Sequence, residues 1–563
     1  MVFSYTATTE NGALDSRIDP SDPMAREAQT FPIVSEEMAA RIARYGSEER
    51  FEARAPVFSR GDRSVDFFVV VEGSIEIFDD DEHDQPQVFV VLRANQFAGE
   101  LDLFNDRQVL VSGRAGEASR IVRVKRADFR RLVSTESDIG EIVMRAFILR
   151  RVGLIRHVHG GVVVVGPAHT ADTLRLQQFL SRNAYPHRLL DTEQDAEAGG
   201  FLECFSLTAA DLPVVIAPGH RVLKNPTLAQ MADDLGLTET FDHAQVFDLA
   251  VVGAGPAGLA AAVYGASEGL QTIVVESMAP GGQAGTSSKI ENYLGFPTGI
   301  SGAALAGRAQ VQAQKFGARL ALSRAVVGLD CDGTPYSLEL DDGERIRARA
   351  IVVATGARYR KLDLAGHERF EGAGIYYAAT AMEASLCAGE EVLVVGGGNS
   401  AGQAAVFLAG SVKHVYMLVR GSGLAATMSD YLVQRIERSE RISLHPRSEV
   451  TALGGDAHLE NVTWTDRASG ERTTRPARSI FVMIGAEPNT QWAARCLKLD
   501  AQGFVCTGAK AGADADSPYA TSRPGVYAVG DVRSGSVKRV ASGVGEGSVV
   551  VQSIHRYLHP PGD

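Results

Sequence analysis

A glycine-rich turn that begins at residue 253 has the residue types and spacing that bind a dinucleotide. It follows the apolar run 248–252 and opens an alanine-rich stretch. Glycine permits the tight turn, and the N–H groups at the start of a helix attract a pyrophosphate. Glu276 ends the next apolar run, 272–276, where a carboxylate can bind ribose hydroxyls. The predicted contacts are Gly253, Gly255, Pro256, Ala257, Gly258 and Glu276.

A second turn of the same kind follows the apolar run 392–395 and opens another alanine-rich stretch. Two such units predict two bound dinucleotides, and a flavin with a nicotinamide is the usual pairing. The predicted nicotinamide contacts in this turn are Gly396, Gly398, Asn399, Ser400 and Ala401.

Strands and helices that alternate along the chain must position both turns. From residue 246 onward, short apolar runs alternate with helical stretches, and glycine turns separate them. This alternation predicts parallel sheets that helices cover on both faces. The fold class is therefore α/β, with two Rossmann-like dinucleotide-binding domains.

Residues 246–560 resemble the thioredoxin reductase family of FAD- and NAD(P)H-dependent oxidoreductases, in which a nicotinamide domain is inserted into an FAD domain. The resemblance rests on both glycine turns and on the stretches 281–283, 291–297, 354–356, 525–531 and 539–541. It implies an FAD domain over 246–362 and 485–563, an NAD(P)H domain over 363–484, and a homodimer. The further residues that it places around FAD are Gly282, Gln283, Asn292, Thr355, Gly356, Gly530, Asp531, Arg539, Val540 and Ala541.

The sequence departs from this family where the redox cysteine pair would stand. Family members have Cys-x-x-Cys shortly before the second glycine turn, whereas residues 378–381 here are Ala-Ala-Thr-Ala. Alanine has no lone pair to attack a disulfide, so a dithiol relay at this position is chemically impossible. We therefore predict an FAD-dependent NAD(P)H oxidoreductase whose acceptor is not a disulfide: ferredoxin, a quinone, dioxygen or a small organic molecule.

Two other hypotheses stay open. The first is disulfide reduction through Cys387, which is the nearest thiol and the one candidate catalytic residue, or through thiols of a partner. A buried structural cysteine is the plainer interpretation of Cys387, because unpaired cysteines mostly behave as small hydrophobic residues. The second hypothesis is a flavin-based sensor of redox state or of a ligand.

The choice between NADPH and NADH depends on one arginine. Family members that use NADPH have several arginines after the second strand of the nicotinamide domain, and only Arg420 stands in the stretch 415–425. One arginine can hold a phosphate through two hydrogen bonds, but fewer charges discriminate less between the two dinucleotides. The sequence slightly favours NADPH.

Residues 31–155 resemble a cyclic-nucleotide-binding domain. Apolar and polar residues alternate over stretches such as 66–78, which predicts a β-roll. The resemblance places Gly99, Glu100 and Arg107 around a cyclic nucleotide, with Glu100 at the ribose and Arg107 at the phosphate. The loop between them is shorter than in the family, and Gln108 replaces a small or hydroxylated residue. The alternative is a β-roll that serves docking or dimerisation.

Residues 160–237 resemble a thioredoxin or glutaredoxin fold, and 238–245 read as a linker. The pattern predicts strands at 162–165 and 212–216 and a helix at 173–182, with Leu212-Pro213 as in the cis-proline turn of that fold. Threonines stand roughly where the cysteines of a thioredoxin would fall. We expect this domain to position a partner or to stabilise an interface.

Bulk composition limits the remaining classes of function. At 563 residues the chain exceeds one hydrophobic core, and residues 1–30 read as a mobile tail without a signal peptide. The net charge of −13 disfavours nucleic acid and anionic membrane as partners, and no apolar run reaches the ~18 residues of a membrane span. Cysteines at 204, 331, 387, 496 and 506 form no Cys-x-x-Cys and no even framework. We therefore predict no metal site and a reducing, cytoplasmic compartment.

Overall fold

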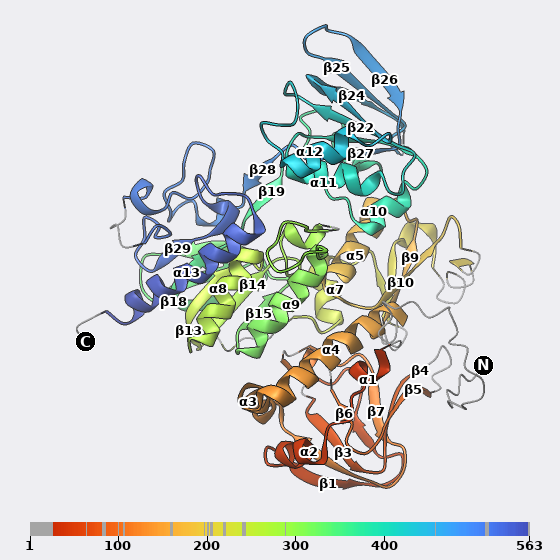
Figure 1. Cartoon of the computed structure of the whole chain (residues 1–563), viewed down its shortest axis with the longest axis vertical. Helices are drawn as coiled ribbons and strands as arrows, with labels where there is room; N and C mark the ends of the chain where they lie inside the picture. The colour runs from red at the N-terminus through yellow and green to blue at the C-terminus, as the bar shows by residue number, and fades with distance from the viewer. Residues whose placement is uncertain are drawn as a thin grey trace. The chain divides into compact units, whose positions relative to one another are not determined.

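A computed structural model of the chain describes residues 26–560, except 64, 81–85, 100, 105–106, 158–160, 196–197, 200–201, 203–206, 218–220, 239–241, 243, 288, 457 and 513–516. It divides into two compact units, Met1–Leu103 with Val109–Gly160, and Phe104–Gln108 with Gly161–Asp563. Figure 1 labels many of the elements of both units. The predicted tail lies outside the described residues up to position 25, but its last four residues form a short helix and Thr30 is buried.

The first unit is a β-roll with flanking helices, as the alternating apolar pattern predicts. Two antiparallel sheets have the strand orders β1-β8-β3-β6 and β2-β7-β4-β5. The strands are β1 (Ser47–Phe51), β2 (Pro56–Phe58), β3 (Phe67–Glu72), β4 (Ile75–Asp80), β5 (Pro86–Leu92), β6 (Phe97–Ala98), β7 (Ser112–Ala115) and β8 (Ser119–Val124). The helices are α1 (Glu27–Thr30), α2 (Glu36–Ala43), η2 (Leu101–Phe104), α3 (Arg126–Thr135) and α4 (Ser137–His157).

Aromatic rings fill the core of this β-roll. Phe67 packs against Phe97, Phe129 and Phe147, with ring centroids 5.3, 4.9 and 6.3 Å away. All four side chains are fully buried. Burial of large rings on one face of each strand is the main stabilising force in such a roll.

The second unit begins with a small sheet of strand order β10-β9-β11-β12. Its elements are β9 (Val162–Gly166), α5 (Ala171–Arg182), β10 (His187–Asp191), η3 (Ala209–Asp211), β11 (Val214–Ala217), β12 (Arg221–Lys224) and α7 (Leu228–Asp234). The predicted strands 162–165 and 212–216 and the predicted helix 173–182 agree with β9, β11 and α5 apart from their ends. The peptide bond between Leu212 and Pro213 is cis, as the resemblance to a thioredoxin fold implies.

A seven-stranded sheet positions the first glycine turn. Its order is β15-β14-β13-β18-β17-β16, and β29 also pairs with β18. Strands β13, β14, β15, β18 and β29 are parallel, whereas β16, β17 and β18 form an antiparallel meander. The strands are β13 (Val246–Val252), β14 (Thr272–Glu276), β15 (Arg319–Leu322), β16 (Val326–Asp330), β17 (Tyr336–Leu340), β18 (Arg345–Val353) and β29 (Val526–Ala528).

Helices pack on the parallel part of this sheet. Figure 1 shows α8 (Pro256–Ser267) and α13 (Val540–Leu558) side by side, and their apolar residues share one core cluster with β13 and β18. The remaining helical segments are η4 (Ala284–Thr286), α9 (Gly302–Lys315), η6 (Gln491–Ala493), η7 (Gly508–Lys510) and η8 (Gly530–Val532). The parallel sheet and its helices confirm the predicted α/β class.

The second glycine turn belongs to a separate parallel sheet of order β20-β27-β21-β22-β23. Its strands are β20 (Ile375–Tyr376), β21 (Glu391–Val395), β22 (His414–Val419), β23 (Ile442–Pro446) and β27 (Ser479–Val482). Helices α10 (Ala381–Leu386), α11 (Asn399–Leu408) and α12 (Asp430–Glu437) and the antiparallel strands β24 (Ser448–Gly454), β25 (Asn461–Asp466) and β26 (Arg472–Pro476) accompany it. The chain enters and leaves this region through the paired strands β19 (Ala357–Tyr359) and β28 (Ala486–Pro488), and η5 (His367–Phe370) follows β19.

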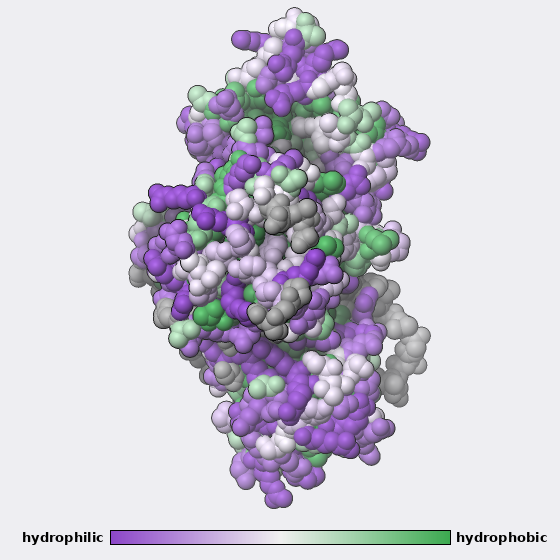
Figure 2. All heavy atoms as spheres, turned by 90° about the vertical axis from the view of Figure 1, so that its left-hand side faces the viewer, coloured by the Kyte–Doolittle hydropathy of each residue, from purple (hydrophilic) through white to green (hydrophobic). Residues whose placement is uncertain are grey.

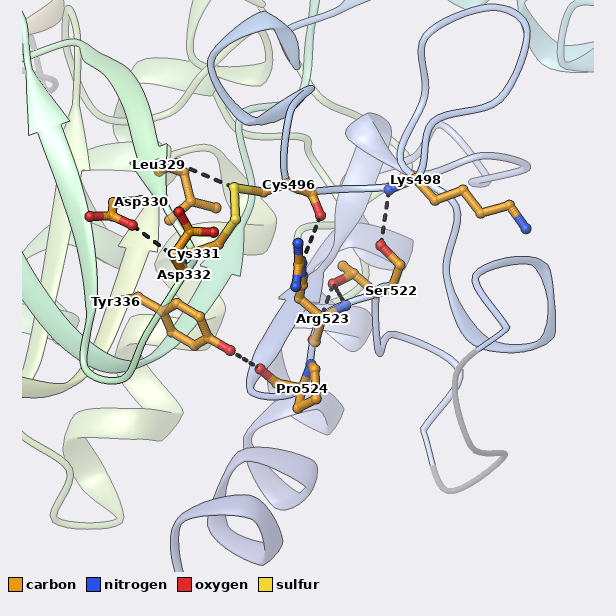
Figure 3. The surroundings of a disulfide bond; sticks show 11 residues. Leu329, Asp330, Cys331, Asp332, Tyr336, Cys496, Lys498, Ser522, Arg523 and Pro524 are labelled. Atoms are coloured by element: carbon orange, nitrogen blue, oxygen red, sulfur yellow. Dashed lines mark hydrogen bonds between the residues drawn. A yellow bond between two sulfur atoms is a disulfide. The ribbon is translucent and has the colours of Figure 1, made fainter.

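A disulfide joins Cys331 to Cys496, which corrects the prediction that the cysteines form no paired framework. The two residues are 165 positions apart, so their meeting depends on the fold and not on a local motif. Figure 3 shows the bond beside Tyr336, Arg523 and Pro524. Arg523 Nε donates to the carbonyl oxygen of Cys496 at 3.2 Å, and the Tyr336 hydroxyl donates to the carbonyl oxygen of Pro524.

One face of the molecule is largely polar. Figure 2 shows one face on which hydrophilic residues predominate and apolar residues are scattered among them. Within the described part of the chain, no helix combines the length and apolar character that crossing a membrane requires. Among the same residues, no group of three or more His, Cys, Asp or Glu side chains is placed to hold a metal ion.

Candidate functional site

The first glycine turn is so tight that two of its positions accept only glycine. Gly253 has a φ of +104°, and a Cβ there would lie 2.4 Å from the carbonyl oxygen of Ala354. A Cβ on Gly258 would lie 1.9 Å from the carbonyl oxygen of Gly253. By contrast, a Cβ on Gly255 would meet nothing closer than the Cα of Gly282 at 4.0 Å. The start of α8, at Pro256, is therefore open to a ligand that accepts hydrogen bonds from backbone N–H groups.

The C-terminal helix α13 packs closely against the first glycine turn at Ala257. A Cβ on Gly547 would lie 2.1 Å from the carbonyl oxygen of Ala257, and a Cβ on Gly530 would lie 2.9 Å from the Ala257 Cβ. Small residues at these positions let α8, α13 and η8 approach closely. The predicted contacts Gly530 and Asp531 consequently lie beside the first glycine turn.

Glu276 supports the same turn from the end of β14. One carboxylate oxygen accepts a hydrogen bond from the N–H of Ala254 at 2.8 Å, and the other accepts from the N–H of Met278 at 3.0 Å. The oxygen that accepts from Met278 also accepts from the Ser277 hydroxyl at 3.5 Å, whereas the oxygen that accepts from Ala254 has a second lone pair that a ribose hydroxyl can use. Glu276 is therefore placed as the sequence predicts, at the edge of the turn.

The crossover between the two dinucleotide domains is locked by hydrogen bonds. The Thr355 hydroxyl donates to the carbonyl oxygen of Asn489 at 2.7 Å, and the Asn489 side chain donates back to the carbonyl oxygen of Thr355 at 3.0 Å. The N–H of Asn489 donates to the carbonyl oxygen of Gly356 at 3.2 Å. The Gln283 side chain donates to the carbonyl oxygen of Ala357. Thr355, Gly356 and Gln283 are thus brought together at the start of β19.

The loop that contains Asp531 is held by a buried ion pair. Glu546 accepts from the N–H of Gly530 at 2.6 Å and from two nitrogens of Arg533, at 2.6 and 3.1 Å. Burial raises the pKa of the Asp531 carboxyl above its ordinary value, and Lys538 acts against this shift. Asp531 is therefore a half-buried acid that gains from hydrogen-bond donors, such as the hydroxyls of a bound ligand.

Two other predicted contact regions are more exposed. Arg539 and Ala541 are exposed and Val540 is half-buried, and all three lie at the start of α13. Asn292 is also exposed. Its neighbour Glu291 forms a salt bridge of 2.6 Å with Arg435 of α12, and this contact lowers the pKa of the Glu291 carboxyl. Asn292 is therefore placed where the FAD-domain sheet and the nicotinamide region meet.

The second glycine turn repeats the geometry of the first. Gly396 has a φ of +139°, and a Cβ there would lie 2.3 Å from the carbonyl oxygen of Met483. Gly398 precedes α11 and has open space where a Cβ would stand. Asn399 accepts a hydrogen bond from the N–H of Ser429 at 2.7 Å. Ser400 is exposed and Ala401 is fully buried, so Ala401 packs the helix while Ser400 faces outward.

A second arginine accompanies Arg420, and the sequence analysis missed it. Arg420 follows β22 and is exposed. The N–H of Arg447, which follows β23, donates to the carbonyl oxygen of Gly421 at 2.9 Å. Parallel pairing of β22 with β23 brings these strand ends together, although the two arginines stand 27 positions apart in the sequence. Arg447 has no sequence signal of its own, because only the sheet places it beside Arg420.

The stretch where a cysteine pair would stand is packed against α5. Ala379 is 8% exposed and shares a core cluster with Leu174 of α5. Glu383, at 1% exposed, accepts from the Gln178 side chain at 3.0 Å and from the N–H of Thr380 at 2.9 Å. Helix α5 therefore covers part of the segment 378–381.

Cys387 lies inside the same core. Its side chain is fully buried, and burial raises the pKa of its thiol to about 12. A thiol with that pKa is almost wholly protonated near neutral pH, so it is a poor nucleophile. Cys506, the other free cysteine among the described residues, is buried as well.

The predicted cyclic-nucleotide contacts are only partly described. Glu100 lies outside the described residues, and Gly99 has a φ of +139° at the end of β6. Arg107 belongs to the second unit, where its Nη1 donates to the carbonyl oxygen of Asn183 at 3.3 Å. Asn183 is the C-cap residue of α5. The roles of Gly99, Glu100 and Arg107 stay predictions.

The residues around the two turns fit dinucleotides of different kinds. The first site has a glycine cradle, a carboxylate for a ribose and the half-buried acid Asp531, whose loop lies beside the first glycine turn. The second has a glycine cradle and two arginines at the strand ends. The region that holds the second site is inserted into the domain that holds the first. Two dinucleotide sites arranged in this way define a flavin- and nicotinamide-dependent oxidoreductase.

Comparisons with known proteins agree with this class. A family model described as pyridine nucleotide-disulphide oxidoreductase matches residues 247–547, and the chain belongs to this family. A model described as cyclic nucleotide-binding domain matches residues 48–136, so the chain also has such a domain near its N-terminus. The cofactors are accordingly FAD and a nicotinamide dinucleotide, NADPH or NADH.

The relatives include thioredoxin reductases and an NADH dehydrogenase. The chain is 31% identical over 319 residues to a thioredoxin reductase of Peptoclostridium litorale, covering 56% of this chain and 97% of the relative. It is 29% identical over 338 residues to an NADH dehydrogenase of Bacillus subtilis, covering 60% and 64%. The solved thioredoxin reductase of Lactococcus lactis matches with a TM-score of 0.52 at 28% identity, covering 55% of this chain and 99% of that one.

Proposed function

We propose that the protein takes electrons from NADPH or NADH through FAD and passes them to an acceptor that is not a disulfide. Ferredoxin, a quinone, dioxygen and a small organic molecule are the candidate acceptors. When bound, FAD supplies the redox chemistry, because it accepts a hydride from the nicotinamide and gives two electrons to the acceptor.

The chain's own residues bind and orient the two dinucleotides. The first glycine turn and Glu276 hold one end of FAD, and the loop at Asp531, fixed by Glu546, holds the middle of the ligand. The start of α13 at Arg539 is assigned to the flavin end. Gly396, Gly398 and Arg420 bind the nicotinamide dinucleotide, and Arg447 strengthens the preference for NADPH.

The observation that favours a non-disulfide acceptor is the composition and packing of residues 378–381. No sulfur stands there, and Ala379 is buried in a core cluster that also contains Leu174. Cys387 is buried and its thiol is protonated near neutral pH, because its pKa is raised to about 12. Neither feature suits a relay of electrons through thiols to a partner protein.

The test compares acceptors on the full-length protein. NADPH under anaerobic conditions should bleach the oxidised flavin, and the bleached protein should then reduce a quinone, ferredoxin or dioxygen faster than thioredoxin or a synthetic disulfide. Unchanged flavin absorbance with both NADPH and NADH rejects the enzyme. A thioredoxin as the fastest acceptor rejects the non-disulfide acceptor.

A disulfide relay through Cys331 and Cys496 is the second candidate, because these residues form the one disulfide among the described residues. The bond lies beside Pro524, which precedes β29, whereas Gly530 and Asp531 follow that strand. This placement favours a structural bond. Cys331→Ser should therefore keep at least half of the wild-type rate with the best acceptor, and a loss of more than tenfold supports the relay. Disulfide turnover that disappears in Cys387→Ser supports Cys387 or partner thiols instead.

We also propose that a cyclic nucleotide binds the N-terminal domain and modulates flavin reduction. The match to residues 48–136 supports the ligand class. Calorimetric titration with cyclic AMP and cyclic GMP, alongside the rate of flavin reduction, tests this. Binding that changes neither the rate nor the nicotinamide affinity rejects modulation. A ligand response without turnover of any acceptor favours a flavin-based sensor.

The domain limits given from the sequence, a homodimer and a cytoplasmic location belong to the same proposal. The family resemblance supports the homodimer, and the acidic net charge of −13 agrees with the absence of nucleic acid as a partner. Light scattering of the purified protein tests the dimer, since a monomer mass at micromolar concentration contradicts it.

A further inference from the structure

We propose that Arg182 of the thioredoxin-like domain binds the pyrophosphate of FAD, so that this domain completes the flavin site. Arg182 is the last residue of α5 and lies 71 positions before Gly253 in the chain (253 minus 182). Neither the family resemblance nor the sequence pattern placed any residue of this domain at the cofactor. The inference concerns cofactor binding, so it does not depend on which acceptor the protein reduces.

The position of the guanidinium carries the proposal. Its Nη2 donates to the carbonyl oxygen of Gly282 at 3.1 Å. Gly282 in turn lies close to Gly255, since a Cβ built on Gly282 would meet the Cα of Gly255 at 3.1 Å. Gly255 precedes α8, whose first N–H groups face the pyrophosphate in a dinucleotide fold. Arg182 therefore reaches the loop that borders the pyrophosphate position.

The guanidinium is poorly satisfied by the protein itself. Nη1 donates to the Met278 thioether at 2.8 Å, which is a weak acceptor. Nε is buried, and no described residue accepts a hydrogen bond from it. A guanidinium has five N–H donors, and the carbonyl of Gly282 is the one strong acceptor described for it. A half-buried cation with spare donors gains most from a phosphate, which accepts two parallel hydrogen bonds.

The electrostatic surroundings agree with this role. Burial lowers the pKa of the Arg182 guanidinium, and attraction to Glu276 and Tyr359 opposes the shift. Burial raises the pKa of the Tyr359 hydroxyl, on which Arg182 and Asp531 act in opposite directions. Arg182 is thus within electrostatic range of Glu276, the carboxylate assigned to the FAD ribose. A doubly negative pyrophosphate beside a carboxylate gains from a nearby cation, and Arg182 supplies one.

Asn183 fixes the arginine in this place. Its side chain donates to the carbonyl oxygens of Phe179 at 3.0 Å and of Met278 at 3.1 Å. Asn183 is 3% exposed, so the end of α5 is anchored on the loop after β14. The N–H of Met278 also donates a hydrogen bond to Glu276, so Met278 links the end of α5 to the carboxylate assigned to the ribose.

The test is the affinity of the full-length apoprotein for two flavins, measured by quenching of flavin fluorescence. Arg182→Gln should weaken FAD binding about 10- to 100-fold, since hydrogen bonds to charged groups are lost. Binding of riboflavin, which has no phosphate, should change less than about twofold. Arg182→Lys keeps the charge without the two parallel hydrogen bonds, so its FAD affinity should lie between those of the wild type and of Arg182→Gln.

The matched control is Arg175→Gln on the same helix. Arg175 donates to Asn225, to the carbonyl oxygen of Pro226 and to Asp172, all within the thioredoxin-like domain. FAD affinity in this variant should stay within about twofold of wild type. Equal losses of FAD and riboflavin affinity in Arg182→Gln or Arg182→Lys, or FAD affinity that is unchanged in both, overturn the proposal. A merely structural role of Arg182 would give equal losses.

Discussion

The buried ion pair between Glu546 and Arg533 gives the sharpest prediction about the flavin site. Glu546 accepts three hydrogen bonds, of 2.6, 2.6 and 3.1 Å, and the two side chains are 11% and 16% exposed. Removing one partner of a buried pair costs about 3–5 kcal/mol, because the other charge is left without compensation. Glutamine keeps one oxygen acceptor, so we expect Glu546→Gln to cost about 2–4 kcal/mol.

The loss should appear as early release of the flavin on heating. The bonds of Glu546 hold the N–H of Gly530, and Asp531 follows directly, so unfolding of this loop exposes FAD. With about 2–4 °C per kcal/mol for a domain of this size, the midpoint of flavin release should fall by about 5–15 °C. Glu449→Gln is the control, because its 3.5 Å pair with Arg467 is exposed and should change the midpoint by less than about 2 °C. A midpoint of flavin release in Glu546→Gln within about 2 °C of wild type refutes the reasoning.

Three further predictions concern the arginines and cysteines. Arg447→Gln should raise the KM for NADPH about tenfold and leave the KM for NADH unchanged, as should Arg420→Gln, because we assign both arginines at these neighbouring strand ends to the 2′-phosphate. Equal effects on both dinucleotides would contradict this. Alkylation of Cys387 in the native protein should be very slow at pH 8, and its rate should rise about tenfold per pH unit up to pH 11. The reason is that the thiol pKa is raised to about 12 and only the thiolate reacts. Rapid labelling at pH 7 would contradict this, because it would show an accessible thiolate. Loss of the bond between Cys331 and Cys496, which closes a long loop, should lower the free energy of unfolding by up to about 5 kcal/mol in urea titrations, and an unchanged urea midpoint would show that the bond contributes nothing.

The sequence predicts the parts of the site that are local in the chain. Strand, glycine turn and helix follow one another within about a dozen residues at Gly253 and at Gly396, so the apolar runs and the glycines are sufficient evidence. The same holds for Glu276, which ends the next strand. Fold class, the two dinucleotide units and the β-roll could therefore be predicted.

The contributions that the sequence could not predict all come from contacts between distant segments. Arg182 ends a helix in another domain, Arg447 reaches Arg420 only through strand pairing, and Cys331 meets Cys496 across 165 residues. Each residue is unremarkable in its local context, as an arginine at a helix end or a lone cysteine. Only tertiary packing gives such residues a role, which is why periodicity and motif spacing do not reveal them.

The most direct test of the central claim uses a variant in which Cys204, Cys331, Cys387, Cys496 and Cys506 are all replaced by serine or alanine. Its anaerobic reduction by NADPH and its turnover of the best wild-type acceptor are measured side by side. If electrons leave the protein without sulfur, both rates should stay within about threefold of wild type, since no thiol takes part in either step. Normal flavin reduction together with a loss of acceptor turnover greater than tenfold would contradict the account, because a thiol would then link the two.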